Sequence, residues 1–366
     1  MRVPDERTLQ QLLDWRPKLG VISLYLSIDP AQRREPWRVT LRNRLDQIAR
    51  EEPDAHERRP ALEATAERIK NHFPEEKPPS GRCQIGFCEV TQKEGRDVWI
   101  SVQMSREETE IVYRDRPHLT PLLELLDEGA PVGVLAVSAE RVRLHEWALG
   151  RLSDIQDWEA VLFMPEWRER KAPTTPDPVR MQGTSSSGHD QFDQRLDANL
   201  GRFLEQVGGL VAREAESRRW RRLIALGDAH QVDLIRRGAK RVQIEIADEA
   251  NVISSNDRGR LIDRVEAAVR EASRRRELEL VKGALDAALT PAGRGALGLA
   301  ETERSLTEGR VRHLLVDAEA PEEDLARLED DLVARALRTS ADVTPVEGEA
   351  AEILREHGGV AALLRY

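Results

Sequence analysis

The side chains with the clearest potential for chemistry lie in one polar stretch of the sequence. The run Gly188-His189-Asp190-Gln191 places an imidazole, a carboxylate and an amide next to one another. A histidine beside a carboxylate can act as a general base, and a glutamine amide can position a water molecule. Side chains that are adjacent in the sequence rarely orient each other well, and a general base must be held in a defined geometry by its partner. We therefore keep His189 and Gln191 as candidate catalytic residues, with a non-catalytic segment as the alternative.

These residues end a longer segment that has almost no core-forming side chains. Residues 164–191 contain four prolines and three consecutive serines. A segment of this length inside a compact domain is usually functional or disordered. We predict a mobile arm, held at both ends by one domain, that reaches into a partner; a disordered surface insertion is the alternative. The candidate contact residues of this arm are Gly183, Ser185, Ser186, Ser187, Gly188, His189, Asp190 and Gln191.

Clusters of arginine form a second kind of candidate site. The net charge of −10 argues against a protein that binds polyanions over its whole surface. Any contact with RNA should therefore be patchy and sensitive to salt. An aromatic ring among arginines can stack on an unpaired base, although such a cluster can equally be a solvated helix face. The candidate RNA-binding residues are Arg33, Arg34, Trp37, Arg38, Arg42, Arg218, Arg219, Arg221 and Arg222.

The remaining composition excludes several classes of protein. The two cysteines, Cys83 and Cys88, form no CxxC pair and have no histidine cluster nearby, which argues against a zinc site and a disulfide framework. We therefore expect no metal and no other cofactor. The polar N-terminus does not fit a signal peptide, and no apolar run is long enough to cross a membrane. We expect a cytoplasmic protein that binds neither membranes nor DNA.

Hydrophobic patterning predicts an α/β chain of three domains. Residues 1–128 combine helical patterns with β-branched runs and predict an α+β domain. Residues 129–258 begin with a buried strand and its hairpin partner and predict a central α/β domain that carries the arm, with a helix resuming at Phe192. Helical and strand patterns alternate through residues 259–366, which predicts an α/β/α sandwich.

Two segments of the last domain carry motifs of a known family. Residues 294–317 (RGALGLAETERSLTEGRVRHLLVD) contain a glycine, an acidic helix, a glycine turn and an apolar strand, and residues 358–366 (GGVAALLRY) contain a closing strand. Both resemble the third domain of the archaeo-eukaryotic peptide-chain release factor and its paralogue Pelota. The resemblance extends to residues 21–30, 86–104 and 131–147. It implies a three-domain architecture whose last domain is of the kink-turn-binding ribosomal protein type, and it points to bacterial relatives of the Balon type.

The resemblance implies a translation factor in the ribosomal A site, with rRNA as its contact and a translational GTPase such as elongation factor Tu as a further partner. The family's stop-codon motif, Asn-Ile-Lys-Ser, and its catalytic motif, Gly-Gly-Gln, are both absent from this sequence. We therefore expect ribosome rescue or hibernation rather than termination. Two alternatives stay open. One is a peptidyl-tRNA hydrolase whose divergent arm uses Gln191 or His189, and the other is an RNA-binding adaptor unconnected to ribosomes.

Overall fold

The computed structural model divides the chain into two compact units. The first combines Met1–Ala130 with Arg270–Tyr366, and the second is Pro131–Val269. The predicted domain boundaries at residues 128 and 258 stay predictions. The residues that the structure describes are 6–29, 35–54, 56–74, 79–106, 108–138, 140–160, 187–220, 222–240, 242–248, 258–290, 293–319 and 323–366.

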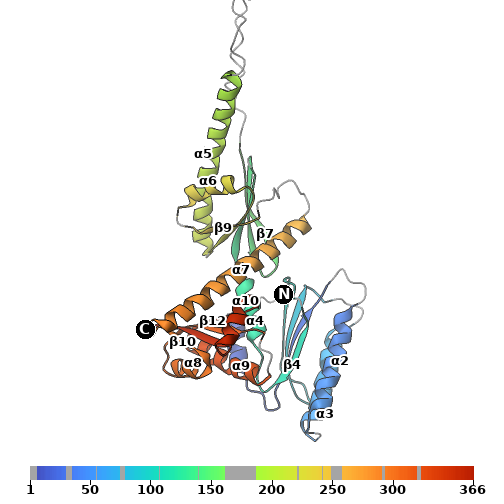
Figure 1. The fold of residues 1–366 in the computed structure, drawn as a ribbon. Coiled ribbons are helices and arrows are strands. Elements are labelled where there is room, and N and C mark those ends of the chain that lie inside the picture. Colours follow the sequence, from blue (N-terminus) through green and yellow to red (C-terminus); the bar gives the residue numbers. More distant parts are fainter. Residues whose placement is uncertain are drawn as a thin grey trace, which may run out of the picture. The chain divides into compact units, whose positions relative to one another are not determined.

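An antiparallel sheet in the order β3-β2-β1-β4 forms the N-terminal part of the first unit. Its strands are β1 (Val21–Ser27), β2 (Cys83–Glu89), β3 (Asp97–Val102) and β4 (Glu110–Arg114). Alternate residues of a strand point to opposite faces, and Ile22, Leu24 and Leu26 accordingly share one buried cluster. Helices α2 (Pro36–Glu51) and α3 (Arg58–His72) supply the other side of that cluster and cover this face of the sheet (Figure 1).

The C-terminal part of the first unit is a three-layer α/β/α sandwich, as the alternation predicted. Its sheet has the order β10-β13-β11-β12, with β11 parallel to β12 and antiparallel to β13. Consecutive residues of β11 enter two different cores, since Leu314 packs with α8 and α9 and Leu315 packs with α7 and α10. The elements are α7 (Arg258–Leu289), β10 (Gly295–Leu297), α8 (Gly298–Thr307), β11 (Val311–Asp317), α9 (Glu323–Arg338), β12 (Asp342–Val346), α10 (Gly348–Glu356) and β13 (Val360–Leu364).

Two short helices complete the first unit. Helix α1 (Glu6–Leu13) precedes β1, and α4 (Thr120–Glu128) follows β4. Leu9 of α1 and Leu123 of α4 both pack into the same buried cluster as Leu314 of β11. The N-terminal and C-terminal parts of this unit therefore share a hydrophobic core.

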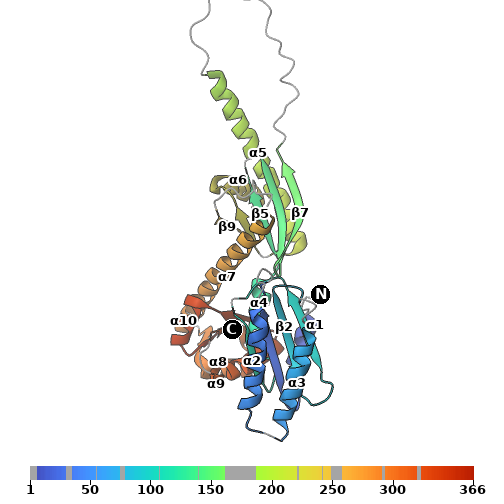
Figure 2. The same cartoon turned by 90° about the vertical axis from the view of Figure 1, so that its right-hand side faces the viewer.

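The second unit is a five-stranded mixed sheet covered by two helices. Strands β5 (Val132–Val137), β6 (Arg141–Ala148) and β7 (Arg151–Glu159) form an antiparallel meander. Strands β8 (Leu223–Leu226) and β9 (Ile244–Asp248) extend it in parallel from β5. Helices α5 (Ser187–Arg218) and α6 (Ala229–Ala239) pack on one face of this sheet, and the N-terminal part of α5 extends past it (Figure 2).

One predicted strand of the second unit was misplaced. The sequence pattern predicted a strand over residues 158–163, of which 161–163 lie outside the described residues, whereas β7 begins earlier and runs from Arg151 to Glu159. Among the described strands β7 pairs with β6 alone, at the edge of the sheet, and most of its side chains are exposed. An edge strand with polar residues on both faces gives no hydrophobic alternation, so its position could not be detected in the sequence. Among the described helices, none combines the length and the apolar character needed to cross a membrane.

Candidate functional site

The predicted arm lies mostly outside the part of the chain that the structure describes. Residues 161–186, which include Gly183, Ser185 and Ser186, belong to the undescribed part. The remaining candidates, Ser187 to Gln191, form the beginning of α5. We had predicted this helix to resume at Phe192, because Ser-Gly-His-Asp-Gln has weak helix propensity and no apolar period.

The first predicted RNA-binding cluster is corrected by the packing of Trp37. This side chain is only 4% exposed and meets Phe73 edge to face, with the ring centroids 5.3 Å apart. Arg38 lies 4.5 Å from the centroid of the Trp37 ring, pairs with Glu35 and donates to the carbonyl of Phe73 at 2.5 Å. Trp37 is therefore a core residue and cannot stack on a base, and Arg38 joins α2 to the end of α3.

The spacing of the apolar residues on α2 already indicated this role for Trp37. Trp37, Leu41, Leu45 and Ile48 recur at the helical period, and all four are buried. Of the other candidates in this cluster, Arg42 is exposed, while Arg33 and Arg34 fall outside the described residues.

The second predicted cluster lies at the end of α5. Arg218 pairs with Glu214 at 3.2 Å and with Glu146 at 3.5 Å, and its guanidinium lies over the Trp220 ring. Arg219 is exposed and adopts a left-handed backbone with φ of 58°, which ends the helix. Arg222 is half-buried, and Arg221 is not among the described residues.

A groove of about 540 Å³ lies next to Arg219. Arg213 and Lys240, which the sequence analysis did not single out, also line it. The pattern missed them because they stand on two helices, α5 and the end of α6, that only the fold brings together. Three cationic side chains at one groove are a feature that phosphate groups can recognise.

A pair formed by a buried histidine of β6 and an exposed aspartate of β7 was also missed. His145 Nδ1 is 2.8 Å from Asp154 Oδ1, and Arg258 donates to both oxygens of Asp154, at 2.9 and 3.2 Å. Burial lowers the pKa of His145, and the hydrogen bond from Arg258 lowers the pKa of Asp154. His145 is 4% exposed and its Nε2 is fully buried without a partner. The hydrogen bond between His145 and Asp154 joins β6 to β7, and Arg258 joins α7 to β7 through Asp154.

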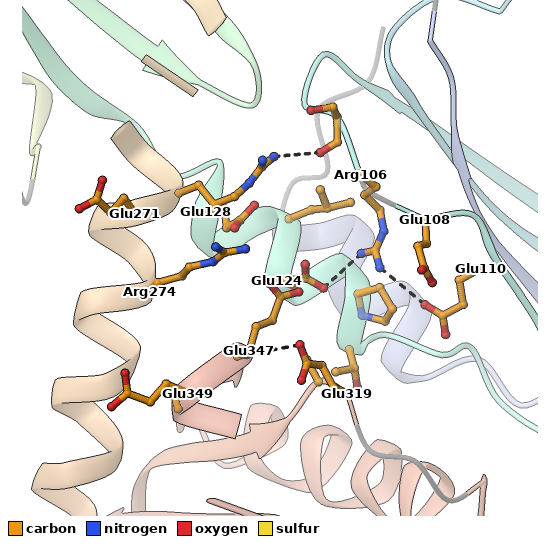
Figure 3. Close-up of a pocket in the computed structure, with 18 of the residues that line it drawn as sticks. Arg106, Glu108, Glu110, Glu124, Glu128, Glu271, Arg274, Glu319, Glu347 and Glu349 are labelled. Atoms are coloured by element: carbon orange, nitrogen blue, oxygen red, sulfur yellow. Dashed lines mark hydrogen bonds and ion pairs between the residues drawn. The ribbon is translucent and has the colours of Figure 1, made fainter. Parts of the chain in front are cut away.

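The first unit contains a larger cavity, of about 830 Å³, that is rich in charged side chains (Figure 3). Arg106 reaches into it and pairs with Glu124 at 3.1 Å and with Glu110 at 3.7 Å. Glu347, which precedes α10, and Glu349, on the first turn of α10, also line the cavity. The charged residues of the lining are Arg106, Glu108, Glu110, Glu124, Glu128, Arg270, Glu271, Arg274, Arg275, Glu319, Glu347 and Glu349.

The electrostatics of this cavity favour a protonated carboxyl group. Burial raises the pKa of Glu124 to about 9; Arg106 opposes this, and a hydrogen bond with Glu347 reinforces it. Burial likewise raises the pKa of Glu128, and it raises that of the nearby Glu277 to about 7. At neutral pH we therefore expect Glu124 to be protonated and to share its proton with Glu347. Within the described residues, no three His, Cys, Asp or Glu side chains are placed to hold a metal ion.

Comparison with known proteins shows which family and which solved structures the chain resembles. Residues 117–270 match the model of bacterial archaeo-eukaryotic release factor family 10. No curated protein matches. Among solved structures, the chain is similar to the archaeal translation termination factor aRF1, with 18% identity, coverage of 98% of this chain and 96% of that one, and a TM-score of 0.26. It is also similar to Archaeoglobus fulgidus Pelota, with 18% identity, coverage of 77% and 79%, and a TM-score of 0.37.

A third similar structure is a model of ribosome-bound archaeal Pelota and ABCE1, with 14% identity, coverage of 95% and 90%, and a TM-score of 0.44. The predicted resemblance to the release factor and Pelota is supported over residues 117–270, which match a bacterial archaeo-eukaryotic release factor family. The matched family, family 10, covers the second unit together with α4.

Proposed function

We propose that this protein binds the ribosome, occupies its A site and acts in ribosome rescue or hibernation. The observation that carries the proposal is the match of residues 117–270 to a bacterial release factor family. In the family that the chain resembles, the middle domain carries the Gly-Gly-Gln loop, which enters the peptidyl-transferase centre. In this chain residues 160–186 come between β7 and α5 in the sequence, and this order supports assigning the same role to them. A translational GTPase such as elongation factor Tu belongs to the proposal as a further partner.

Three features favour occupancy over hydrolysis. The chain lacks Gly-Gly-Gln, whose paired glycines would give the backbone freedom to approach the ester. The nearest substitute, Gly188 to Gln191, belongs to helix α5, where positions 189 and 190 are adjacent and do not share a helix face. Asp190 would also bring negative charge toward an ester that already lies among phosphates. The hydrolase and the ribosome-independent RNA adaptor remain the competing functions.

The exposed cations indicate where contact with rRNA should occur. The candidate contacts are Arg42 on α2 and, beside the groove, Arg213, Arg219 and Lys240. They form small separate patches of positive charge, as expected for an RNA-binding protein with a negative net charge. Each phosphate contact releases counterions, so binding should weaken as salt rises.

Co-sedimentation of the full chain with ribosomes at increasing salt tests this function. We expect saturable binding that A-site tRNA displaces. Reversal of Arg213, Arg219 and Lys240 to Glu should reduce affinity by roughly tenfold or more, because reversed charges repel phosphates. The matched control is Arg304→Glu, an exposed position on α8 outside the groove. Absence of binding would overturn the ribosomal function, and binding that A-site tRNA does not displace would overturn the A-site placement.

A further inference from the structure

The charged cavity of the first unit has no part in the proposed function. Its lining holds eight glutamates and four arginines, so carboxyl groups are in excess. Arg106 pairs with Glu124 at 3.1 Å, and Arg270 donates to the carbonyl of Ser105 at 3.5 Å. Glu349, on the first turn of α10, is exposed and lies on a different wall from α4 (Figure 3). The negative charge is therefore distributed around the cavity instead of meeting at one point.

An independent feature of the cavity indicates that something polar binds in it. Thr120 lines the cavity at the start of α4 and is 4% exposed. Its Oγ1 is fully buried and has no hydrogen-bond partner. A buried hydroxyl without a partner loses its hydration and gains no hydrogen bond in return, which destabilises the folded state. A ligand with an N–H group would remove this penalty, since a hydroxyl oxygen accepts hydrogen bonds.

The lining also contains apolar surface between the charges. Leu125, Leu278 and Ala318 lie among the acidic residues. This combination suits a molecule whose positive groups are separated by methylene chains. A single cation would use only one wall, and no described cluster of side chains has the arrangement that a metal ion needs.

We infer that this cavity binds a small organic polycation of the polyamine class, with its ammonium groups on the glutamates of the separate walls and on the hydroxyl of Thr120. The methylene chain would cover Leu125 and Leu278. An ammonium group placed near Glu124 would favour the ionised form of that carboxyl. Binding should therefore release a proton.

Titration calorimetry of the full chain with spermidine tests the inference, and it does not depend on ribosomes. We expect one saturable site. Glu349→Gln should weaken the affinity about tenfold, which corresponds to about 1.4 kcal/mol. The matched control is Glu352→Gln, which removes the same charge from an exposed position of the same helix outside the lining. This control should bind spermidine as the unaltered protein does.

A second variant separates binding from folding. Thr120→Val removes an oxygen that has no partner, so it should leave the melting temperature unchanged or higher while weakening spermidine binding. Titration in buffers of different ionisation enthalpy should report proton release near pH 7.

Three results would overturn the inference. The first is the absence of saturable binding, and the second is an equal effect of Glu349→Gln and Glu352→Gln. The third is binding of Mg²⁺ or of a lysine-rich peptide in place of spermidine with the same dependence on Glu349 and Thr120.

Discussion

Gly208 of α5 and Gly238 of α6 lie against each other where the two helices pack together. A methyl group added to Gly208 would lie 2.9 Å from the Cα of Gly238, and one added to Gly238 would lie 3.1 Å from the Cα of Gly208. Both would also overlap backbone carbonyl oxygens, those of Ile235 and Glu205 respectively. The two helix backbones are therefore in direct contact, and neither position can accept a side chain unless the helices separate.

Substitution of Gly208 by Ala should destabilise the second unit. Forced separation of packed elements typically costs about 1–3 kcal/mol. The neighbouring Gly209 provides the control, because a methyl group there would meet no atom within 4 Å. Gly209→Ala should raise stability by about 0.5–1 kcal/mol, the gain from glycine to alanine inside a helix. Thermal and urea unfolding measure both variants, and a stabilising effect of Gly208→Ala would contradict the close packing.

Stability of the first unit should fall as pH rises from about 5 to 9. The folded pKa of Glu124 is about 9, above its ordinary value of 4.5, because the side chain is buried and faces Glu347 and Glu128 as well as Arg106. Between these two values the folded protein holds a proton that the unfolded chain releases, so each step up in pH favours unfolding. Glu277, with a pKa of about 7, adds to the slope at the acidic end of this window.

Melting temperatures of the full chain across this pH range measure the effect. Glu124→Gln imitates the protonated carboxyl and should flatten the slope, whereas Glu352→Gln, on an exposed position, should leave it unchanged. A Glu124→Gln variant with the same pH dependence as the original protein would mean that Glu124 is ionised when folded.

Substitution of Gln191 distinguishes occupancy of the peptidyl-transferase centre from hydrolysis of peptidyl-tRNA. If the protein occupies the peptidyl-transferase centre without chemistry, Gln191→Ala should leave its activity intact, and the same holds for His189→Ala. Deletion of residues 173–186, which leaves α5 whole, should abolish protection of the ribosome. In a hydrolase, loss of a group that positions the water typically costs on the order of a hundredfold in rate.

A single-turnover assay with labelled peptidyl-tRNA on ribosomes gives the answer. Rapid release by the intact protein that is lost in Gln191→Ala would establish the hydrolase and refute the occupancy model. Release that none of the variants alters would exclude both candidate catalytic residues.

The parts of the fold that the sequence predicted well are those where hydrophobic periodicity is strong. Leu24 and Leu314 lie in apolar runs bounded by turn residues, and their strands form where expected. Strand β7 and the first turns of α5 were misplaced because neither has an apolar period. The sandwich could be predicted from local patterns, since each of its helices carries its own apolar stripe.

The charged cavity and the contacts of Asp154 with His145 and Arg258 could not be predicted from the sequence for a different reason. Arg106 and Glu124 are 18 positions apart, and Arg258 and Asp154 are 104 positions apart. Partners at such separations meet only through the folded sheet and helices. Trp37 shows the opposite error, since the sequence did contain the necessary information. Its helical spacing with Leu41 and Leu45 indicates a core residue, whereas we had assigned it to RNA binding because of the neighbouring arginines.

The positions of Cys83 and Cys88 allow local opening of the N-terminal sheet to be followed by thiol modification. These are the only two thiols in the sequence, and both lie on β2 with no exposed surface. Burial raises the pKa of Cys83 to about 12 and that of Cys88 well above its usual value, which suppresses the reactive thiolate. Their odd spacing places them on opposite faces of the sheet. A thiol reagent can therefore modify either cysteine only after local opening of the structure. The order in which Cys83 and Cys88 react shows which face of the sheet opens first.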